Sequence, residues 1–304
     1  MTVESSRSAM DVARRRHPTM NRPICLITES LDRQRGGAES HLADLVQFFV
    51  RAGHPVRAFV RRPGGCPSSV ELEIVPPSAD WGALGERRFS RALQHRLAGA
   101  SGIVLSTLPL NLREVTHYFS PGGLYRSGFE AERDSFGPGL RQRFYRLGNR
   151  LNLQRQRWRT AQEKLLAREA RLDVLTLSAA ARSEMLHLFP RPAESVVTIP
   201  SGVDLTVFRP GSIADPQAEG LRLLFVGHNL RLKGLHCLLR ALGSAGQSGL
   251  QAELTVAGGG ANGAFKALAR RLGLASRVRF LGPVAADELA ALYRRSDALV
   301  HPTF

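Results

Sequence analysis

The sequence predicts an α/β protein of two domains, each with a parallel β-sheet flanked by helices, and three observations lead to this class. Short β-branched runs alternate with helical patterns along most of the chain, which is typical of parallel sheets. The segment Pro210–Gly220 (PGSIADPQAEG) is rich in Pro, Gly and small polar residues, as linkers between domains are. The chain has 304 residues, 43% of them hydrophobic, which is enough for one large or two ordinary domains.

The first domain is expected over residues 23–205, after a basic tail over residues 1–22 that we expect to be disordered. Its strands are expected at Ile24–Thr28, Val56–Val60, Leu72–Val75, Ile103–Thr107, Val174–Ser178 and Ser195–Pro200. The spacing of apolar residues predicts helices at Ala38–Ala52, Glu86–Ala98 and Ala179–Phe189, and an Arg-rich helical region at Leu140–Arg171.

The second domain is expected over residues 221–304, after a linker over residues 206–220. Its strands are expected at Leu221–Val226, Ala252–Ala257, Val278–Leu281 and Ala298–His301, with helices at Leu235–Leu242 and Phe265–Leu272. Two Rossmann-like domains then face each other, and such folds bind ligands beyond the carboxyl ends of their strands. The run Ser296–Phe304 (SDALVHPTF) is typical of a buried strand leading into a loop, so we expect the second domain to be incomplete at Phe304.

Composition and charge narrow the function classes. The net charge of +16 favours anionic partners, which include phosphorylated ligands, nucleic acid and an acidic membrane face. Nucleic-acid binding is a remote alternative, because the chain has no RNP-like aromatic motif, zinc-finger spacing or helix-turn-helix signal. No apolar run approaches the ~20 residues that span a bilayer, and no signal peptide is evident, so we expect a cytoplasmic protein.

The cysteines indicate neither a metal site nor disulfides. Cys25, Cys66 and Cys237 are odd in number, far apart in the sequence and without metal-ligand spacing, which fits a reducing compartment. We expect no metal, and we expect the three side chains to act as small buried hydrophobes.

Two glycine-containing loops are the candidate binding sites. The first follows the first expected strand and contains Gly36, Gly37 and Glu39 (RGGAE, residues 35–39) at the start of an amphipathic helix. Glycines there let backbone N–H groups approach a phosphate at the positive end of the helix. The other interpretation is a tight strand-to-helix turn without a ligand.

The second loop holds the same place in the second domain. It contains Gly227, Arg231, Lys233 and Gly234 (GHNLRLKG, residues 227–234) between an expected strand and an expected helix. Two cations and the amino end of a helix would stabilise the negative charge that grows on a departing diphosphate. The other interpretation is a pair of solvated cations on a loop.

These loops belong to a longer succession of motifs. In order, the motifs are RGGAE at 35–39, TLS at 176–178, VTIPSGVDLTVFRP at 197–210, FVGHNLRLKGL at 225–235, LTVAGGG at 254–260, VRFLGPV at 278–284 and LYRRSDALVHPT at 292–303. Their ordered succession resembles the family 4 glycosyltransferases of the GT-B fold, and within them the lipopolysaccharide core glucosyltransferase group. The resemblance covers the chain from about Ile24 to Phe304.

The resemblance implies a retaining transfer of a hexose from a nucleotide sugar, such as a UDP-hexose, to an acceptor hydroxyl, with no metal or other cofactor required. The implied acceptor is a glycan or a lipid-linked molecule of the cell envelope. The roles that carry over are donor-diphosphate binding for Arg231, Lys233, Gly227 and Gly234, approach to donor or acceptor for Gly36, Gly37 and Glu39, and contact with the transferred sugar for His117 in THYFSPGG.

The chain departs from the family pattern in two places. Many members place an arginine directly after the strand-ending glycine, whereas this chain has His228 there and Arg231 three residues later. The family's acidic motif, two glutamates seven residues apart that bind the donor sugar and ribose, would begin just after Phe304. The alternative hypothesis is therefore a truncated, inactive chain, or half of a split enzyme.

The Arg-rich region Leu140–Arg171 suggests a second kind of partner. Its cations far outnumber Glu163 and Glu169, and apolar residues such as Phe144 and Leu147 recur at near-helical spacing. A basic amphipathic surface of this kind suits anionic lipid, here the inner face of the membrane. The other interpretation is a solvated helix whose apolar stripe packs on the domain.

Overall fold

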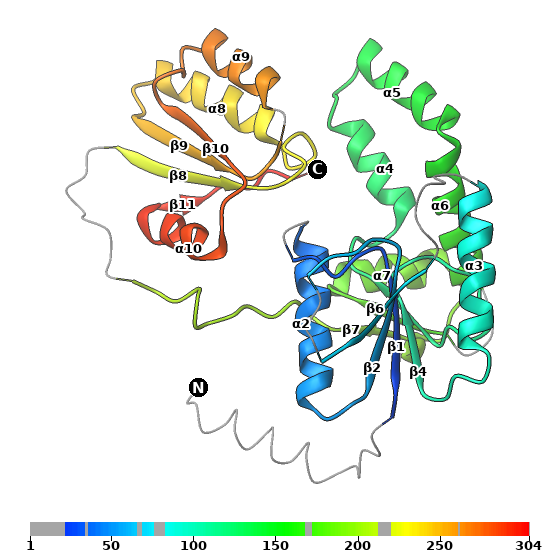
Figure 1. Cartoon of the computed structure of the whole chain (residues 1–304). Coiled ribbons are helices and arrows are strands. Elements are labelled where there is room, and N and C mark those ends of the chain that lie inside the picture. The colour runs from blue at the N-terminus through cyan, green and yellow to red at the C-terminus, as the bar shows by residue number, and fades with distance from the viewer. Residues whose placement is uncertain are drawn as a thin grey trace. The chain divides into compact units, whose positions relative to one another are not determined.

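The computed structural model describes residues 22–33, 36–65, 69–75, 83–167, 172–211, 220–260 and 262–303. The chain divides into two compact units (Figure 1), the first made of Met1–Leu124 with Gln154–Pro200 and the second of Tyr125–Leu153 with Ser201–Phe304. The predicted basic tail, except for Arg22, and most of the predicted linker lie outside the described residues, as does Cys66.

The first unit is built on a seven-stranded parallel sheet in the order β3-β2-β1-β4-β5-β6-β7. The strands are β1 Ile24–Thr28, β2 Val56–Val60, β3 Glu71–Ile74, β4 Ile103–Ser106, β5 His117–Ser120, β6 Asp173–Thr176 and β7 Val196–Thr198. The helices are α2 Gly37–Arg51, α3 Ala83–Leu97, α6 Leu153–Leu166 and α7 Ala179–Leu188, and a short 3₁₀ turn spans Ala193–Ser195.

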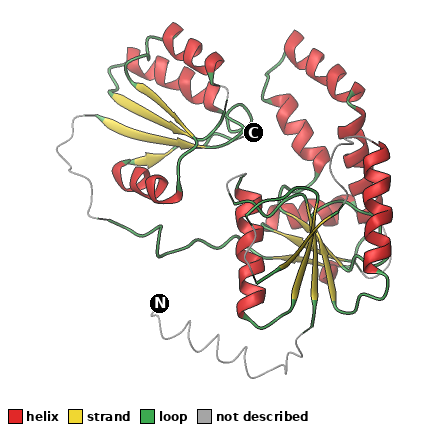
Figure 2. Ribbon diagram, viewed as in Figure 1, coloured by secondary structure: helices red, strands yellow, loops and turns green. Residues whose placement is uncertain are grey.

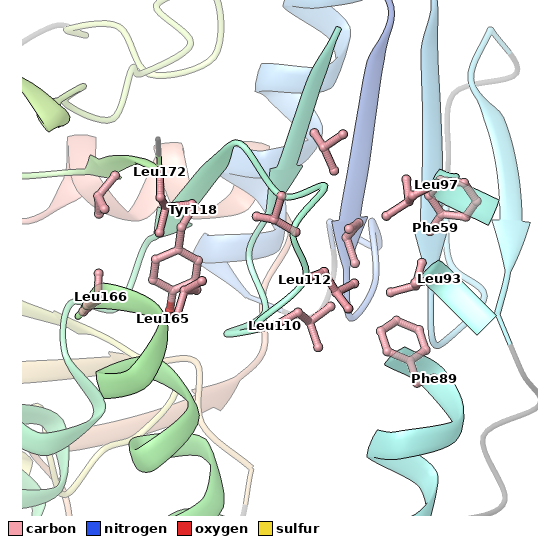
Figure 3. Packing of buried hydrophobic residues seen from close by; sticks show 14 of the residues in the cluster. Phe59, Phe89, Leu93, Leu97, Leu110, Leu112, Tyr118, Leu165, Leu166 and Leu172 are labelled. Carbon is pink, nitrogen blue, oxygen red and sulfur yellow. The ribbon is translucent and has the colours of Figure 1, made fainter. Parts of the chain in front are cut away.

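Two hydrophobic clusters cover the two faces of this sheet. On one face α2 buries Leu42 and Val46, which are four residues apart and so lie on one side of the helix. On the other face Phe59 of β2 packs with side chains of α3, and Tyr118 of β5 packs beside Leu165 of α6 (Figure 3). Burial on both faces explains why most residues of the central strands are apolar.

The second unit contains a four-stranded parallel sheet in the order β10-β9-β8-β11. Its strands are β8 Leu221–Val226, β9 Ala252–Ala257, β10 Val278–Gly282 and β11 Ala298–Leu299. The helices are α4 Tyr125–Asp134, α5 Leu140–Leu151, α8 Leu235–Gln247, α9 Gly263–Arg271 and α10 Ala286–Arg295. One hydrophobic cluster joins the sheet to α8 and α9, and a smaller cluster joins it to α10. Figure 2 shows these helices on both sides of the sheet.

The predicted α/β class with two parallel sheets is confirmed, and three expectations need correction. The segment His117–Ser120 is strand β5, and α4 and α10 are further helices that we did not predict. The last strand is shorter than expected and is not buried: Leu299 is 50% exposed, because β11 pairs only with β8 at the edge of the sheet. Cys25 and Cys237 are only half-buried.

Candidate functional site

The order of strands in the first sheet reverses between β1 and β4, since β2 and β3 follow β1 on one side and β4 to β7 lie on the other. Open parallel sheets bind ligands at such a switch point, outside the carboxyl ends of the strands. There the Thr107 hydroxyl donates to the Thr28 hydroxyl at 2.9 Å, which joins the ends of the two strands.

The predicted glycine loop lies at this switch point. Gly36 is extended (φ 166°) and caps α2, and its carbonyl accepts the Ser40 N–H at 3.0 Å in the first turn. A β-carbon at Gly37 would meet no atom within 4 Å, so the backbone at the positive end of α2 is open to a ligand. Glu39 lies half-buried in the same turn. The structure therefore brings Gly36, Gly37 and Glu39 together at the edge where a ligand is expected.

A row of buried hydroxyls supports the loops along this edge, and sequence reasoning missed it. The last residues of four neighbouring strands are Thr28, Ser106, Ser120 and Thr176, each at most 4% exposed. The hydroxyls of Ser106, Ser120 and Thr176 donate to carbonyls of the loops that follow their own strands, and that of Thr28 accepts from Thr107 after β4. The signal was present in the strand runs ICLIT, IVLS, HYFS and DVLT, each of which ends in Ser or Thr.

His117 does not lie at this edge. It is the first residue of β5, so the carboxyl end of the strand at Ser120 is about 10 Å farther along the chain. The ring contacts the Thr116 hydroxyl through Nδ1 at 2.8 Å, and Nε2 is 3.6 Å from Oδ2 of Asp173. Burial lowers the pKa of His117, and the charge of Asp173 opposes that shift. The sugar-contact role of His117 stays a prediction, and this position does not favour it.

In the second unit the switch point lies between β8 and β11. Gly227 follows β8 and donates its N–H to the Ala257 carbonyl at 3.0 Å. A β-carbon at Gly227 would lie 3.1 Å from Cγ of Lys233, so the lysine stem folds over the glycine. Gly234 caps α8 in a left-handed conformation (φ 77°). The structure therefore brings Gly227, Lys233 and Gly234 together; their binding of a diphosphate stays a prediction.

The charge in this loop comes from side chains more than from free amides. The N–H groups of Gly234 and Leu235 already bond within the loop, to the carbonyls of Arg231 and Leu230 at 2.9 Å each. Lys233 is half-buried, and within the described ranges it has no ion pair with an acidic residue. The Arg231 guanidinium lies 4.7 Å from the centroid of the Phe136 ring. Lys233 therefore places a cation beside the strand-ending Gly227, without an acidic partner in the part of the chain that the structure describes.

His301 is a further residue of this switch point that sequence reasoning did not select. It follows β11, and its ring centroid is 5.8 Å from that of Phe225 in β8. Burial lowers the pKa of His301, and the charge of Lys233 lowers it further. The sequence could have pointed to His301, because this residue comes two positions after the last strand. The loop after β8 follows its own strand in the same way.

Two other findings bear on ligands. Within the ranges that the structure describes, no group of three or more His, Cys, Asp or Glu side chains is arranged to hold a metal ion. A pocket of about 760 Å³ lies between the segment Val203–Gly211 and α10, and it includes Ser296 and Asp297 at the amino end of β11. That position is opposite to the edge where the predicted site residues gather.

Parts of the sequence are similar to known proteins. Residues 220–304 match the family described as "Glycosyl transferases group 1". The D-inositol 3-phosphate glycosyltransferase 2 of Catenulispora acidiphila is 39% identical over 138 residues, which are 40% of this chain and 32% of that protein. The corresponding enzyme of Corynebacterium kroppenstedtii is 31% identical over 165 residues, 48% of this chain and 36% of that protein. The match thus spans about a third of the length of each relative.

Solved structures share the fold of this chain. WaaG, a glycosyltransferase involved in lipopolysaccharide biosynthesis, superposes with a TM-score of 0.70 at 20% identity, over 92% of this chain and 75% of WaaG. Sucrose-phosphate synthase from Thermosynechococcus elongatus superposes with a TM-score of 0.71 at 17% identity, over 93% of this chain and 76% of that enzyme. These likenesses confirm the predicted fold class.

Proposed function

We propose that this chain, which belongs to the glycosyltransferases of the GT-B fold, transfers a hexose from a nucleotide sugar to a glycan or lipid-linked acceptor of the cell envelope. The observation that carries the proposal is the half-buried Lys233 at the switch point between β8 and β11, which has no acidic partner among the described residues. A cation held at such a place suits the diphosphate of a nucleotide sugar.

In the proposed reaction, the second unit stabilises the leaving group. As the bond between sugar and diphosphate breaks, negative charge grows on the diphosphate oxygens. Lys233 and the positive end of α8 face that charge, and a fixed cation stabilises it without reorganisation. Gly227 and Gly234 keep the loop narrow, because side chains there would meet Lys233 and Pro302. Arg231 is expected to contribute less to this stabilisation, since its guanidinium already lies over Phe136.

The first unit would hold the acceptor. The open backbone of Gly37 at the amino end of α2 and the hydroxyl-supported loops along the sheet edge suit a polar, hydroxyl-rich molecule. A phosphorylated acceptor fits the same features, and the likeness to inositol phosphate glycosyltransferases favours it as the second candidate. Retention of the anomeric configuration is part of the proposal and comes from the family resemblance.

We also propose a peripheral position at an anionic membrane surface, through α5. The apolar residues Leu140, Phe144, Leu147 and Leu151 follow one another at intervals of four, three and four, so they form one stripe of the helix. Each is 55–70% exposed. Within the described residues no helix is long and apolar enough to cross a membrane.

Charge decides which partner suits this stripe. Helix α5 contains Arg141, Arg143, Arg146 and Arg150 and no acidic residue. A second copy of the chain would set these arginines against each other, whereas anionic headgroups attract them and the apolar stripe enters the interface. The Tyr145 hydroxyl donates to Glu132 of α4 at 2.8 Å, which fixes the orientation of α5 on its neighbour.

The test of the proposed activity is a transfer assay with the purified chain. A panel of UDP-, GDP- and ADP-hexoses is combined with envelope lipid extract or with inositol phosphate, and the release of nucleoside diphosphate is followed. The proposal expects release that depends on one donor and on an acceptor, with a product that keeps the anomeric configuration in its NMR spectrum. No transfer with any donor would overturn the proposal.

A further inference from the structure

Gln162 of α6 lies under the turn that follows β5. It is 2% exposed, and its Nε2 donates to the Tyr118 hydroxyl at 2.9 Å and to the Gly123 carbonyl at 3.1 Å. The same nitrogen is 3.4 Å from the Ser120 hydroxyl oxygen. A buried amide without such partners costs folding free energy, so these contacts account for a polar side chain in this place. Figure 3 shows Tyr118 of β5 beside Leu165 and Leu166, which belong to α6 like Gln162.

The turn itself is closed by two local hydrogen bonds between Ser120 and Gly123. The Ser120 hydroxyl donates to the Gly123 carbonyl at 2.6 Å, and the Gly123 N–H donates to the Ser120 carbonyl at 3.3 Å. Gly123 has a φ of 72°, which glycine adopts without strain. The Gly123 carbonyl therefore accepts from two side chains, one inside the turn and one from α6, 39 residues later in the chain.

The outer side of this turn is open. A β-carbon at Gly122 or Gly123 would meet no atom within 4 Å. The turn lies at the carboxyl end of β5, beside β4, which borders the switch point. A ligand at that edge can approach the backbone of the turn, because neither glycine carries a side chain and, among the described residues, no atom fills the space beside them.

We infer that Gln162 is a positioning residue that holds the turn Ser120–Gly123 in place as a ligand-contact surface of the first unit. Gln162 acts through the turn, since it is too deeply buried to touch a ligand itself. The inference rests on the proposed function for the identity of that ligand, the acceptor or the transferred sugar. A side chain of similar size without N–H groups would keep the packing and lose the hold on Gly123.

Gln162→Met tests this inference, with Gln94→Met at an exposed position of α3 as the matched control. Hydrogen exchange of the amides of residues 122–124 should rise about tenfold in Gln162→Met, the effect of losing one hydrogen bond, and should stay unchanged in the control. Transfer should fall about tenfold in kcat/KM, while the Kd for the nucleoside diphosphate stays within twofold. Unchanged exchange in the turn would overturn the inference, as would an equal loss of nucleotide affinity and turnover, which marks general damage.

Ser120→Ala provides a second route if Gln162→Met does not fold. It removes the other donor to the Gly123 carbonyl, so the same amides should exchange faster, and unchanged exchange would count against the inference. Hydrogen exchange can be measured without transferase activity. A failure of this inference can therefore be told apart from a failure of the proposed function. A wild-type chain without transferase activity contradicts the proposed function, whereas the exchange of residues 122–124 still decides whether Gln162 holds the turn.

Discussion

Gly234 and Pro302 lie against each other: a β-carbon at position 234 would be 2.0 Å from the carbonyl oxygen of Pro302. The segment after β11 therefore runs directly over the first turn of α8. This contact joins the loop that contains Lys233 to the segment that contains His301, so the two sides of the switch point form one packed structure. Gly234 also has a φ of 77°, and both features require glycine there.

Gly234→Ala should destabilise the second unit. The left-handed conformation costs an alanine roughly 1–2 kcal/mol, and displacement of Pro302 adds to that cost. The midpoint of thermal unfolding should fall by at least about 3 °C. Gly263→Ala is the control, because Gly263 begins α9 and a β-carbon there would meet nothing within 4 Å. Equal midpoints for the two variants would show that the contact is not tight in solution.

Lys233→Met should weaken the binding of a nucleoside diphosphate. A hydrogen bond between a lysine and a phosphate contributes about 1.5–3 kcal/mol, so the Kd measured by calorimetry should rise about tenfold or more. Lys266→Met makes the same substitution on α9 and should leave the Kd unchanged. If both variants bind as tightly as the wild type, the loop after β8 does not hold the diphosphate.

The ion pair of Asp297 and Arg222 predicts a dependence of stability on pH. Asp297 accepts the backbone N–H and a guanidinium N–H of Arg222, each at 2.7 Å, and these hydrogen bonds lower its pKa to about 2. The folded-state pKa is below the unfolded value of about 3.9. The ion pair therefore stabilises fully above that value, and its effect is lost as pH falls through about 2.

Asp297→Asn should accordingly lower the unfolding midpoint at pH 7 by more than it does at pH 3. Asp287→Asn, at an exposed position in the first turn of α10, is the matched substitution, and its effect should change less between these two pH values. An effect of Asp297→Asn that is the same at both values would contradict the assignment of the low pKa to this carboxyl.

Phe144→Glu should reduce binding to anionic vesicles about tenfold, because the phenylalanine buries apolar area in the interface. The measurement is cosedimentation with vesicles of phosphatidylcholine and phosphatidylglycerol at low salt. Binding of the wild type should weaken with added salt, as expected for arginine and headgroup contacts. Phe48→Glu is the control, since Phe48 is 63% exposed on α2 of the first unit. Equal loss in both variants would refute a specific role of α5.

Much of the fold followed from the hydrophobic runs. The predicted bounds of β1, β2, β8 and β9 agree with the structure residue for residue, because most residues of these strands are apolar and at least half of each strand is buried. Helix α4 is only ten residues long and buries none of its side chains, so its apolar pattern is too short to indicate a helix. The strand β5 is only four residues long and begins with histidine and tyrosine, which gave too weak a pattern.

The sequence predicted the candidate site where glycines mark the end of a strand. It did not predict the position of a residue along its strand. Gly36, Gly37, Gly227 and Lys233 lie at the switch points because a parallel sheet brings the carboxyl ends of its strands together. The place of His117 depends on where β5 begins, which the sequence pattern did not show. Gln162 contacts Gly123 from far along the chain, and such pairings come from tertiary packing alone.

The central claim is that the switch point between β8 and β11 binds the diphosphate of a nucleotide sugar. The most direct test is hydrogen exchange of the whole chain with and without UDP, GDP or ADP. One of these nucleotides should protect residues 227–236 and 301–303, and Lys233→Met should abolish this protection. Protection confined to other segments, or none with any of the three nucleotides, would show that the diphosphate does not bind at this switch point.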